Sequence, residues 1–172
     1  MGLVPEFEKF FTFSSLFFLA CNSDSKSKDT ANDIPDEELW EIYWTDLKKV
    51  VGKNDLQGVV KLIDFPLEGN FFKTNTGKGL SRKGVLNNYE KIIGNNVRLR
   101  VIAATPQEWS ERKVASAKES KSLGIPVGET VKILTLNFVF NKGQEDQTES
   151  AQMFYFAKIK GEYKWCAMEI VG

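Results

Sequence analysis

Apolar residues recur at helical spacing between residues 36 and 93. Over 36–51 they return every three or four positions, acidic residues fill the first turn and lysines stand near the end, as a helix and its dipole favour. A second helix is predicted after Asn54 or Asp55, either of which is a good N-cap, and it ends at Phe65-Pro66. A third helix is predicted over 81–93.

Strand-like patterns of apolar residues dominate the chain after residue 96. Residues 97–101 alternate between apolar and basic side chains, which predicts a strand with one face in water. The sequence TPQE at 105–108 is a capping box with proline at the first helical position, so a helix over about 106–120 is predicted, with an irregular or extended segment as the alternative. Three further strands are predicted at 131–140, 150–160 and 163–171. A tight turn at Gly161-Glu162 joins the last two.

The order of these elements predicts a single α+β domain over residues 36–172. Three N-terminal helices are expected to pack on one face of a curved antiparallel sheet. The other face of that sheet is left open, so a homodimer or an adaptor role through this face is one hypothesis for the function.

An uncharged segment stands near the start of the chain. Its eleven residues, 10–20, are too few for the roughly 20 that a membrane-spanning helix needs, and they are typical of the apolar core of a secretory signal peptide. The tetrad FLAC that ends at Cys21 resembles the lipobox of bacterial lipoprotein precursors. The resemblance implies a signal peptide over 1–20, a lipidated Cys21 and attachment to the membrane of the bacterial cell envelope, on the outer membrane or the periplasmic side.

The alternative for this segment is a buried apolar helix with Cys21 in a structural role. If Cys21 is not lipidated, a disulfide between Cys21 and Cys166 is a further alternative in an exported protein. Residues 21–35 are almost entirely small, polar or charged, so they bury too little surface to fold and are expected to form a flexible tether.

Composition narrows the chemistry of the domain. The chain has 23 basic and 23 acidic residues, which disfavours a nucleic-acid partner. It has no histidine and two cysteines, which excludes serine–histidine and cysteine–histidine nucleophile pairs, histidine-ligated zinc and a thiolate zinc site. No metal and no cofactor are expected.

Three sequence features carry a resemblance to the nuclear transport factor 2-like superfamily, which includes ketosteroid isomerase-like and SnoaL-like proteins. They are the aromatic helix WEIYWTDLKKVV at 40–51, the segment DFPL at 64–67 and the closing hairpin FYFAKIKGEYKWCAMEI at 154–170. The resemblance spans about 36–172 and implies a cone-shaped fold. Its members range from isomerases and dehydratases to noncatalytic binding modules, so it implies no particular activity.

The leading hypothesis is a noncatalytic domain that binds a small apolar ligand or an envelope protein. A cone can enclose an apolar cavity, and packing in an ordinary core is the alternative for each aromatic side chain. The candidate lining residues are Tyr43, Trp44, Phe71, Phe72, Phe138, Phe154 and Trp165.

The alternative hypothesis is a lyase or isomerase that uses a buried carboxylate base with a tyrosine donor. Candidates by residue type are Asp46, Asp64, Glu90, Tyr43 and Tyr155. None stands at a spacing that matches the catalytic pattern of the superfamily, so no catalytic residue is assigned.

Overall fold

The computed structural model describes residues 34–72, 79–105, 108–140, 142–143, 145 and 147–172. The predicted signal peptide, Cys21 and all but the last two residues of the predicted tether lie outside this part of the chain. The helices are α1 (Asp36–Gly52), α2 (Leu56–Lys61), α3 (Arg82–Asn87), α4 (Tyr89–Ile92), α5 (Asn95–Ala103) and α6 (Ala117–Leu123), with a 3-10 turn η1 (Asn70–Phe72). The strands are β1 (Ile63–Glu68), β2 (Trp109–Lys113), β3 (Thr130–Phe140), β4 (Thr148–Ile159) and β5 (Glu162–Val171). None of the helices described is long and apolar enough to cross a membrane.

The described strands form one five-stranded sheet in the order β1-β5-β4-β3-β2. The strands β2 to β5 pair antiparallel, whereas β1 pairs parallel with β5, so the sheet is mixed rather than antiparallel as predicted. The difference arises at residues 63–68, for which the sequence pattern predicts a helix end and a turn. They form an edge strand instead, with Ile63 beside Trp165.

The carboxamide of Asn70 extends this edge by one more residue pair. Its Nδ2–H donates to the carbonyl of Ile170 at 2.9 Å, and its Oδ1 accepts the Ile170 N–H at 2.8 Å. The side chain therefore replaces a backbone partner in the ladder between β1 and β5.

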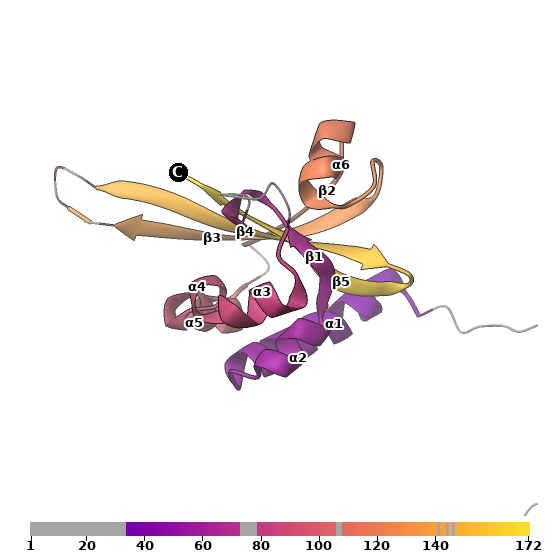
Figure 1. Cartoon of the computed structure of the whole chain (residues 1–172), viewed down its shortest axis with the longest axis horizontal. Coiled ribbons are helices and arrows are strands. Elements are labelled where there is room, and N and C mark those ends of the chain that lie inside the picture. The colour runs from indigo at the N-terminus through magenta and orange to yellow at the C-terminus, as the bar shows by residue number, and fades with distance from the viewer. Residues whose placement is uncertain (1–33, 73–78, 106–107, 141, 144, 146) are drawn as a thin grey trace, which may run out of the picture. The chain divides into compact units, whose positions relative to one another are not determined.

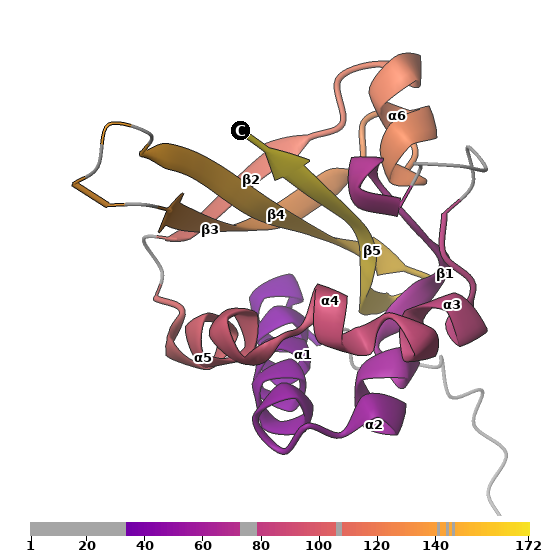
Figure 2. The same cartoon turned by 60° about the vertical axis from the view of Figure 1, so that its left-hand side comes forward.

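The helices cover the two faces of the sheet unequally. Figures 1 and 2 show α1 to α5 on one face and α6 on the other. Leu134 and Leu136 of β3 pack toward the larger helical layer, whereas Val131 and Ile133 pack toward α6. The sheet thus separates two apolar cores, which confirms the predicted α+β class with helices packed on a sheet.

The first two helices form as their sequences predict. The helix α1 spans the predicted region, with acidic residues in its first turn and Lys49 in its last. Asp55 is the N-cap of α2, and its side chain accepts the Gly58 N–H at 2.9 Å. The third predicted helix is interrupted at Asn88, whose side-chain amide donates to the Gly84 carbonyl at 2.8 Å, and it becomes α3 and α4.

The prediction of a strand at 97–101 is wrong, because these residues belong to α5. Val97 and Val101 are 6% and 2% exposed, whereas Leu99 between them is 56% exposed. Residues four apart share a face in a helix as well as in a strand, so a five-residue alternation fits both. The outward position of Leu99 is what a helix produces and a strand does not.

The prediction of a helix over 106–120 is wrong for its first half. Glu108 accepts the Thr105 N–H at 2.9 Å, as a capping box requires, but the chain then enters β2, with Trp109 opposite Leu134. The helix α6 begins only after Ser116, whose hydroxyl accepts the Glu119 N–H at 3.2 Å. The alternative of an extended segment is therefore confirmed for 109–113.

The hairpin between β4 and β5 turns one residue earlier than predicted. Lys160 and Gly161 have φ values of +52° and +88°, while Glu162 already belongs to β5. Positive φ at both central residues is the geometry of a type I′ turn, which matches the twist of the two strands.

Candidate functional site

Three of the four tryptophans of the chain meet where α1 packs near β2. Trp40 and Trp44 lie one turn apart on α1, with nearly parallel rings whose centroids are 6.0 Å apart. Trp109, the first residue of β2, is perpendicular to both, at 4.9 Å from Trp40 and 4.5 Å from Trp44. All three are half-buried, and we refer to them as the tryptophan cluster.

The tryptophan cluster rests on aromatic residues of the core. The ring of Trp40 lies 5.7 Å from Phe156 of β4 and 5.1 Å from Tyr163 of β5, both in edge-to-face geometry. Such contacts contribute about 0.5–1.5 kcal/mol each beyond the burial of apolar area. The cluster is therefore held in one geometry by three strands and a helix.

A lysine lies beside the cluster. Lys132 of β3 has a side chain that is only 10% exposed, and its ammonium lies 5.4 Å from the ring centroid of Trp40. Its Nζ donates to Glu111 Oε2 at 2.7 Å and to Glu37 Oε1 at 3.3 Å. Burial opposes the charge, but the hydrogen bonds and the charges of Glu111 and Glu37 outweigh burial and raise the pKa of Lys132. These contacts therefore favour the charged form of the lysine.

An open pocket of about 190 Å³ lies beside the ion pair of Lys132 and Glu111. It is lined by Trp40, Trp109, Ser110, Glu111 and Lys132. Pockets for drug-sized ligands usually measure about 300–1,000 Å³. The pocket therefore fits one chemical group, such as a side chain or the head of a larger molecule. We refer to it as the tryptophan pocket.

The predicted lining residues occupy different depths of the core on the helical face. Tyr43, Phe154 and Trp165 are buried, Trp44, Phe71 and Phe138 are half-buried at its boundary, and the side chain of Phe72 lies outside the described part. Of these residues, the structure brings Trp44 into the tryptophan cluster. That all seven line one ligand cavity stays a prediction.

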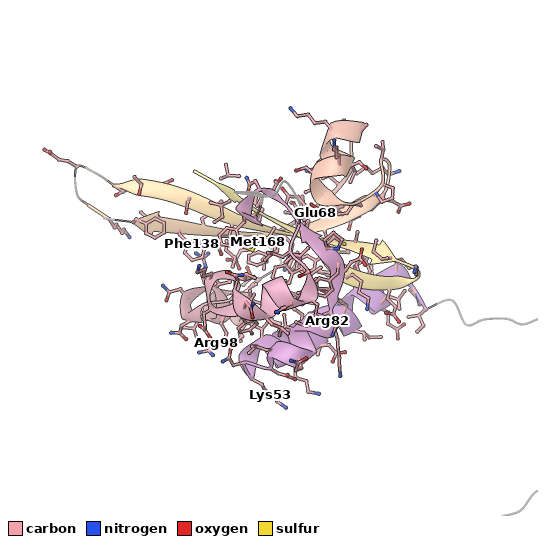
Figure 3. All side chains as sticks on the ribbon, viewed as in Figure 1. Lys53, Glu68, Arg82, Arg98, Phe138 and Met168 are labelled. Carbon is pink, nitrogen blue, oxygen red and sulfur yellow. The ribbon has the colours of Figure 1, made fainter. Side chains whose placement is uncertain are left out.

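Two of these residues border separate hollows. Tyr43 lines an open hollow of about 260 Å³ together with Leu39, Ile42 and Asp46. Phe138 lines one of about 220 Å³ toward the free end of the β3–β4 hairpin (Figure 3). The guanidinium of Arg100 lies 5.3 Å from the ring of Phe138.

The carboxylates considered for catalysis lie apart from one another. Asp46 is exposed on α1, Asp64 is half-buried in β1, and Glu90 is exposed on α4. The phenol of Tyr43 donates to the Leu62 carbonyl at 3.2 Å, and burial raises its pKa well above the usual value. Of this set, the structure brings Asp46 and Tyr43 to one open hollow, where Asp46 is exposed and the Tyr43 hydroxyl is bonded to a backbone carbonyl.

The remaining candidate, Tyr155, belongs to a polar pocket on the other face of the sheet. Its hydroxyl donates to Glu169 Oε2 at 2.8 Å, and burial together with this contact raises the pKa of Tyr155. Arg112 and Glu119 form an ion pair at the same pocket, which measures about 230 Å³. Because Glu119 also accepts the Ala115 N–H at 2.8 Å, these contacts fix α6 on the sheet.

The sequence interpretation missed most of the tryptophan pocket. The capping box at 105–108 predicts a helix that includes Trp109, and the pattern at 131–140 predicts a strand without singling out Lys132. One signal was available: Lys132 is the single charged residue in VKILTLNFVF at 131–140. A buried charge in such a strand needs a partner, and the partner is Glu111, which the register of β2 on β3 places opposite it.

Comparison with known proteins finds distant structural similarity and gives no activity. No protein-family model matches the chain, and no curated protein matches it in sequence. It is similar to a solved NTF-2 like protein of unknown function from Shewanella oneidensis MR-1, at 11% identity and a TM-score of 0.37, covering 78% of this chain and 97% of that one. It is also similar to the beta subunit of the benzoate 1,2-dioxygenase from Burkholderia mallei, at 7% identity and a TM-score of 0.37, covering 80% and 90%.

At such identities and TM-scores these similarities carry no argument about this chain. The class of protein is therefore defined by the architecture itself, an α+β domain with helices packed on a mixed sheet.

Proposed function

We propose that the chain is a lipid-anchored protein of the bacterial cell envelope whose folded domain is a noncatalytic binding domain. The uncharged segment 10–20, which ends at Cys21, supports the anchor, and the polar residues after it support a tether. The tryptophan pocket is its binding site.

The observation that carries the binding role is the gathering of half-buried tryptophans around one open pocket. Tryptophan supplies a large apolar surface at low entropic cost and is enriched at the centres of binding sites. A cluster that served only the core would be covered, as Trp165 is at 1% exposed. Here Trp40 and Trp109 border a hollow that also offers a carboxylate and a hydroxyl group, from Glu111 and Ser110.

To test the anchor, bacteria that express the full chain are grown with an alkyne fatty acid as the label. We expect label on the wild type and on Cys166→Ala, and none on Cys21→Ser. Cys166 is the matched control because it is the other cysteine and is only 3% exposed. Label that persists in Cys21→Ser, or an unlabelled wild type released in soluble form, would contradict the anchor.

The binding role is tested by native mass spectrometry of the full chain, extracted from bacteria in mild detergent. We expect a small co-purifying mass on the wild type that is lost in Trp109→Ala. The control is Phe140→Ala, which also removes an aromatic ring but at a 52% exposed position at the end of β3. An adduct that survives Trp109→Ala, or no adduct on the wild type, contradicts the assignment of the pocket.

A homodimer through the uncovered sheet face is the second candidate function. Val139 and Val171 are 47% and 54% exposed and line the hollow toward the free end of the β3–β4 hairpin. Sedimentation of the full chain in detergent tests it. A dimer that dissociates in Val139→Asp supports this candidate, and a monomeric wild type excludes it.

A further inference from the structure

The tryptophan pocket carries one uncompensated negative charge. Glu37 and Glu111 each hold one negative charge, and Lys132 supplies one positive charge between them. The carboxylates are 77% and 52% exposed; Glu111 lines the pocket, and Glu37 contacts Lys132 at its wall. Lys132 contacts one oxygen of each, and in the part of the chain that the structure describes the other oxygen has no partner.

The neighbouring residues of α1 add to this negative charge. Glu41 lies one turn after Glu37 and is exposed on the same side of the helix. Within the described residues no basic side chain pairs with Glu41. Anions are therefore repelled at this pocket, and cations are attracted.

The walls of the pocket already hold a cation. The ammonium of Lys132 lies 5.4 Å from the Trp40 centroid, and that of Lys48 lies 5.4 Å from the Trp44 centroid. Both distances are within the roughly 6 Å over which a cation is attracted to an aromatic face. Two of the indoles thus bind ammonium groups within the chain, and the pocket beside Trp109 offers the same chemistry to a group from outside.

The shape and size of the pocket select among cations. A volume of about 190 Å³ admits the end of one side chain rather than a peptide backbone. A guanidinium is planar, stacks on an indole and donates to a carboxylate from two nitrogens, whereas an ammonium is a compact and strongly hydrated charge. Trp109 and Glu111 both line this pocket, so it offers an indole and a carboxylate to one guanidinium.

We infer that the tryptophan pocket binds a guanidinium group, as carried by arginine. The inference rests on the proposed function, because it names the ligand class of the same pocket. Lys132 then has an unusual role. It neutralises part of the acidic charge and so holds the affinity for the incoming cation below its maximum.

The test uses the indole N–H signals of the full chain, labelled with ¹⁵N-tryptophan in detergent. The probes are N-acetyl-arginine amide and its neutral isostere, N-acetyl-citrulline amide. We expect the arginine compound to shift the signals of Trp40, Trp44 and Trp109 to saturation, and citrulline to shift none. The signal of Trp165 is an internal control, because its N–H donates to the Ala167 carbonyl at 2.9 Å in the core.

Variants then separate a binding role from a structural one. Glu111→Gln should weaken binding about threefold, the effect of one partly exposed charge pair, and the exposed Glu90→Gln of α4 should not. Lys132→Met should strengthen binding about threefold, because both carboxylates are then free for the ligand. If Lys132 had only a structural role, Lys132→Met would weaken binding instead. This variant also keeps the inference testable where Glu111→Gln does not fold.

The results have distinct meanings. Equal shifts with citrulline, weaker binding by Lys132→Met, or no saturation with the arginine compound would overturn the inference. If such a failure coincides with a co-purifying mass that Trp109→Ala removes, the pocket binds another ligand and the proposed function stands. Free arginine as a third probe distinguishes the sources: equal binding supports a free guanidinium compound, and weaker binding than the blocked form supports an arginine within a protein.

Discussion

Gly69, the residue that follows β1, lies directly against the backbone of β5. Its φ is +117°, and a Cβ placed on it would lie 1.8 Å from the carbonyl oxygen of Met168 and 2.6 Å from its carbonyl carbon. Met168 is in the middle of β5 and is itself fully buried, so its backbone cannot move without disturbing the ladders on both sides. We therefore expect Gly69→Ala to destabilise the protein severely.

The size of this effect follows from a comparison with Gly128. Gly128 has a φ of +88°, but a Cβ there would meet nothing within 4 Å. Gly128→Ala therefore carries only the cost of a left-handed conformation, about 1–2 kcal/mol. Gly69→Ala carries that cost plus overpacking of about 1–3 kcal/mol, a sum of about 2–5 kcal/mol.

The assay is urea unfolding of the full chain, followed by circular dichroism, for the wild type and both variants. The free energy of unfolding should fall more for Gly69→Ala than for Gly128→Ala, with similar dependence on urea. Equal losses at the two positions would refute the reasoning, because the contact with Met168 would then contribute nothing.

Three further predictions concern stability and reactivity. The hydroxyl of Tyr163 donates to Asp36 at 2.6 Å and lowers the pKa of this carboxyl. The contribution of Asp36 to the free energy of unfolding is therefore present at neutral pH and is lost as the pH falls below about 4. In urea unfolding, Tyr163→Phe should be less stable than the wild type at neutral pH, and the difference should shrink in acid. Burial raises the pKa of Cys166 to about 12, so iodoacetamide should modify this thiol in urea and not in the native protein at mildly alkaline pH, and rapid native modification would contradict the buried position. Leu134→Ala should cost about 2–5 kcal/mol of unfolding free energy because Leu134 is 1% exposed, whereas Leu99→Ala at 56% exposed should change it by less than about 0.5 kcal/mol.

Local patterns predicted the elements that depend on local interactions. The helix α1 has a long apolar stripe, and α2 has a capping aspartate, so each is determined by neighbours in sequence. The strand prediction for 97–101 was wrong because five residues cannot distinguish the helical from the strand period, which coincide at Val97 and Val101. Its state is decided by the core against which these two residues pack.

The candidate site depended on contacts that no local pattern contains. Trp109 joins Trp40 because β2 pairs with β3 and not because of its own neighbours in the chain. Glu111 and Lys132 face each other through the same register. Sequence alone identified Trp44 as a candidate binding residue, but the pairing that completes the pocket appears only in the folded sheet.

The parallel edge strand β1 also sets the order in which this fold is completed. Its ladder partner is β5, the last strand, and the contact that Asn70 makes with Ile170 spans 100 residues. A chain that emerges from a ribosome or a translocation pore releases α1 to α5 first, yet this edge of the sheet stays open until the ten residues of β5 arrive. Premature termination before β5 would leave both β1 and β4 with unpaired backbone groups, a template for aggregation. Closure of the sheet at its β1 edge therefore waits for β5, the last strand of the described fold.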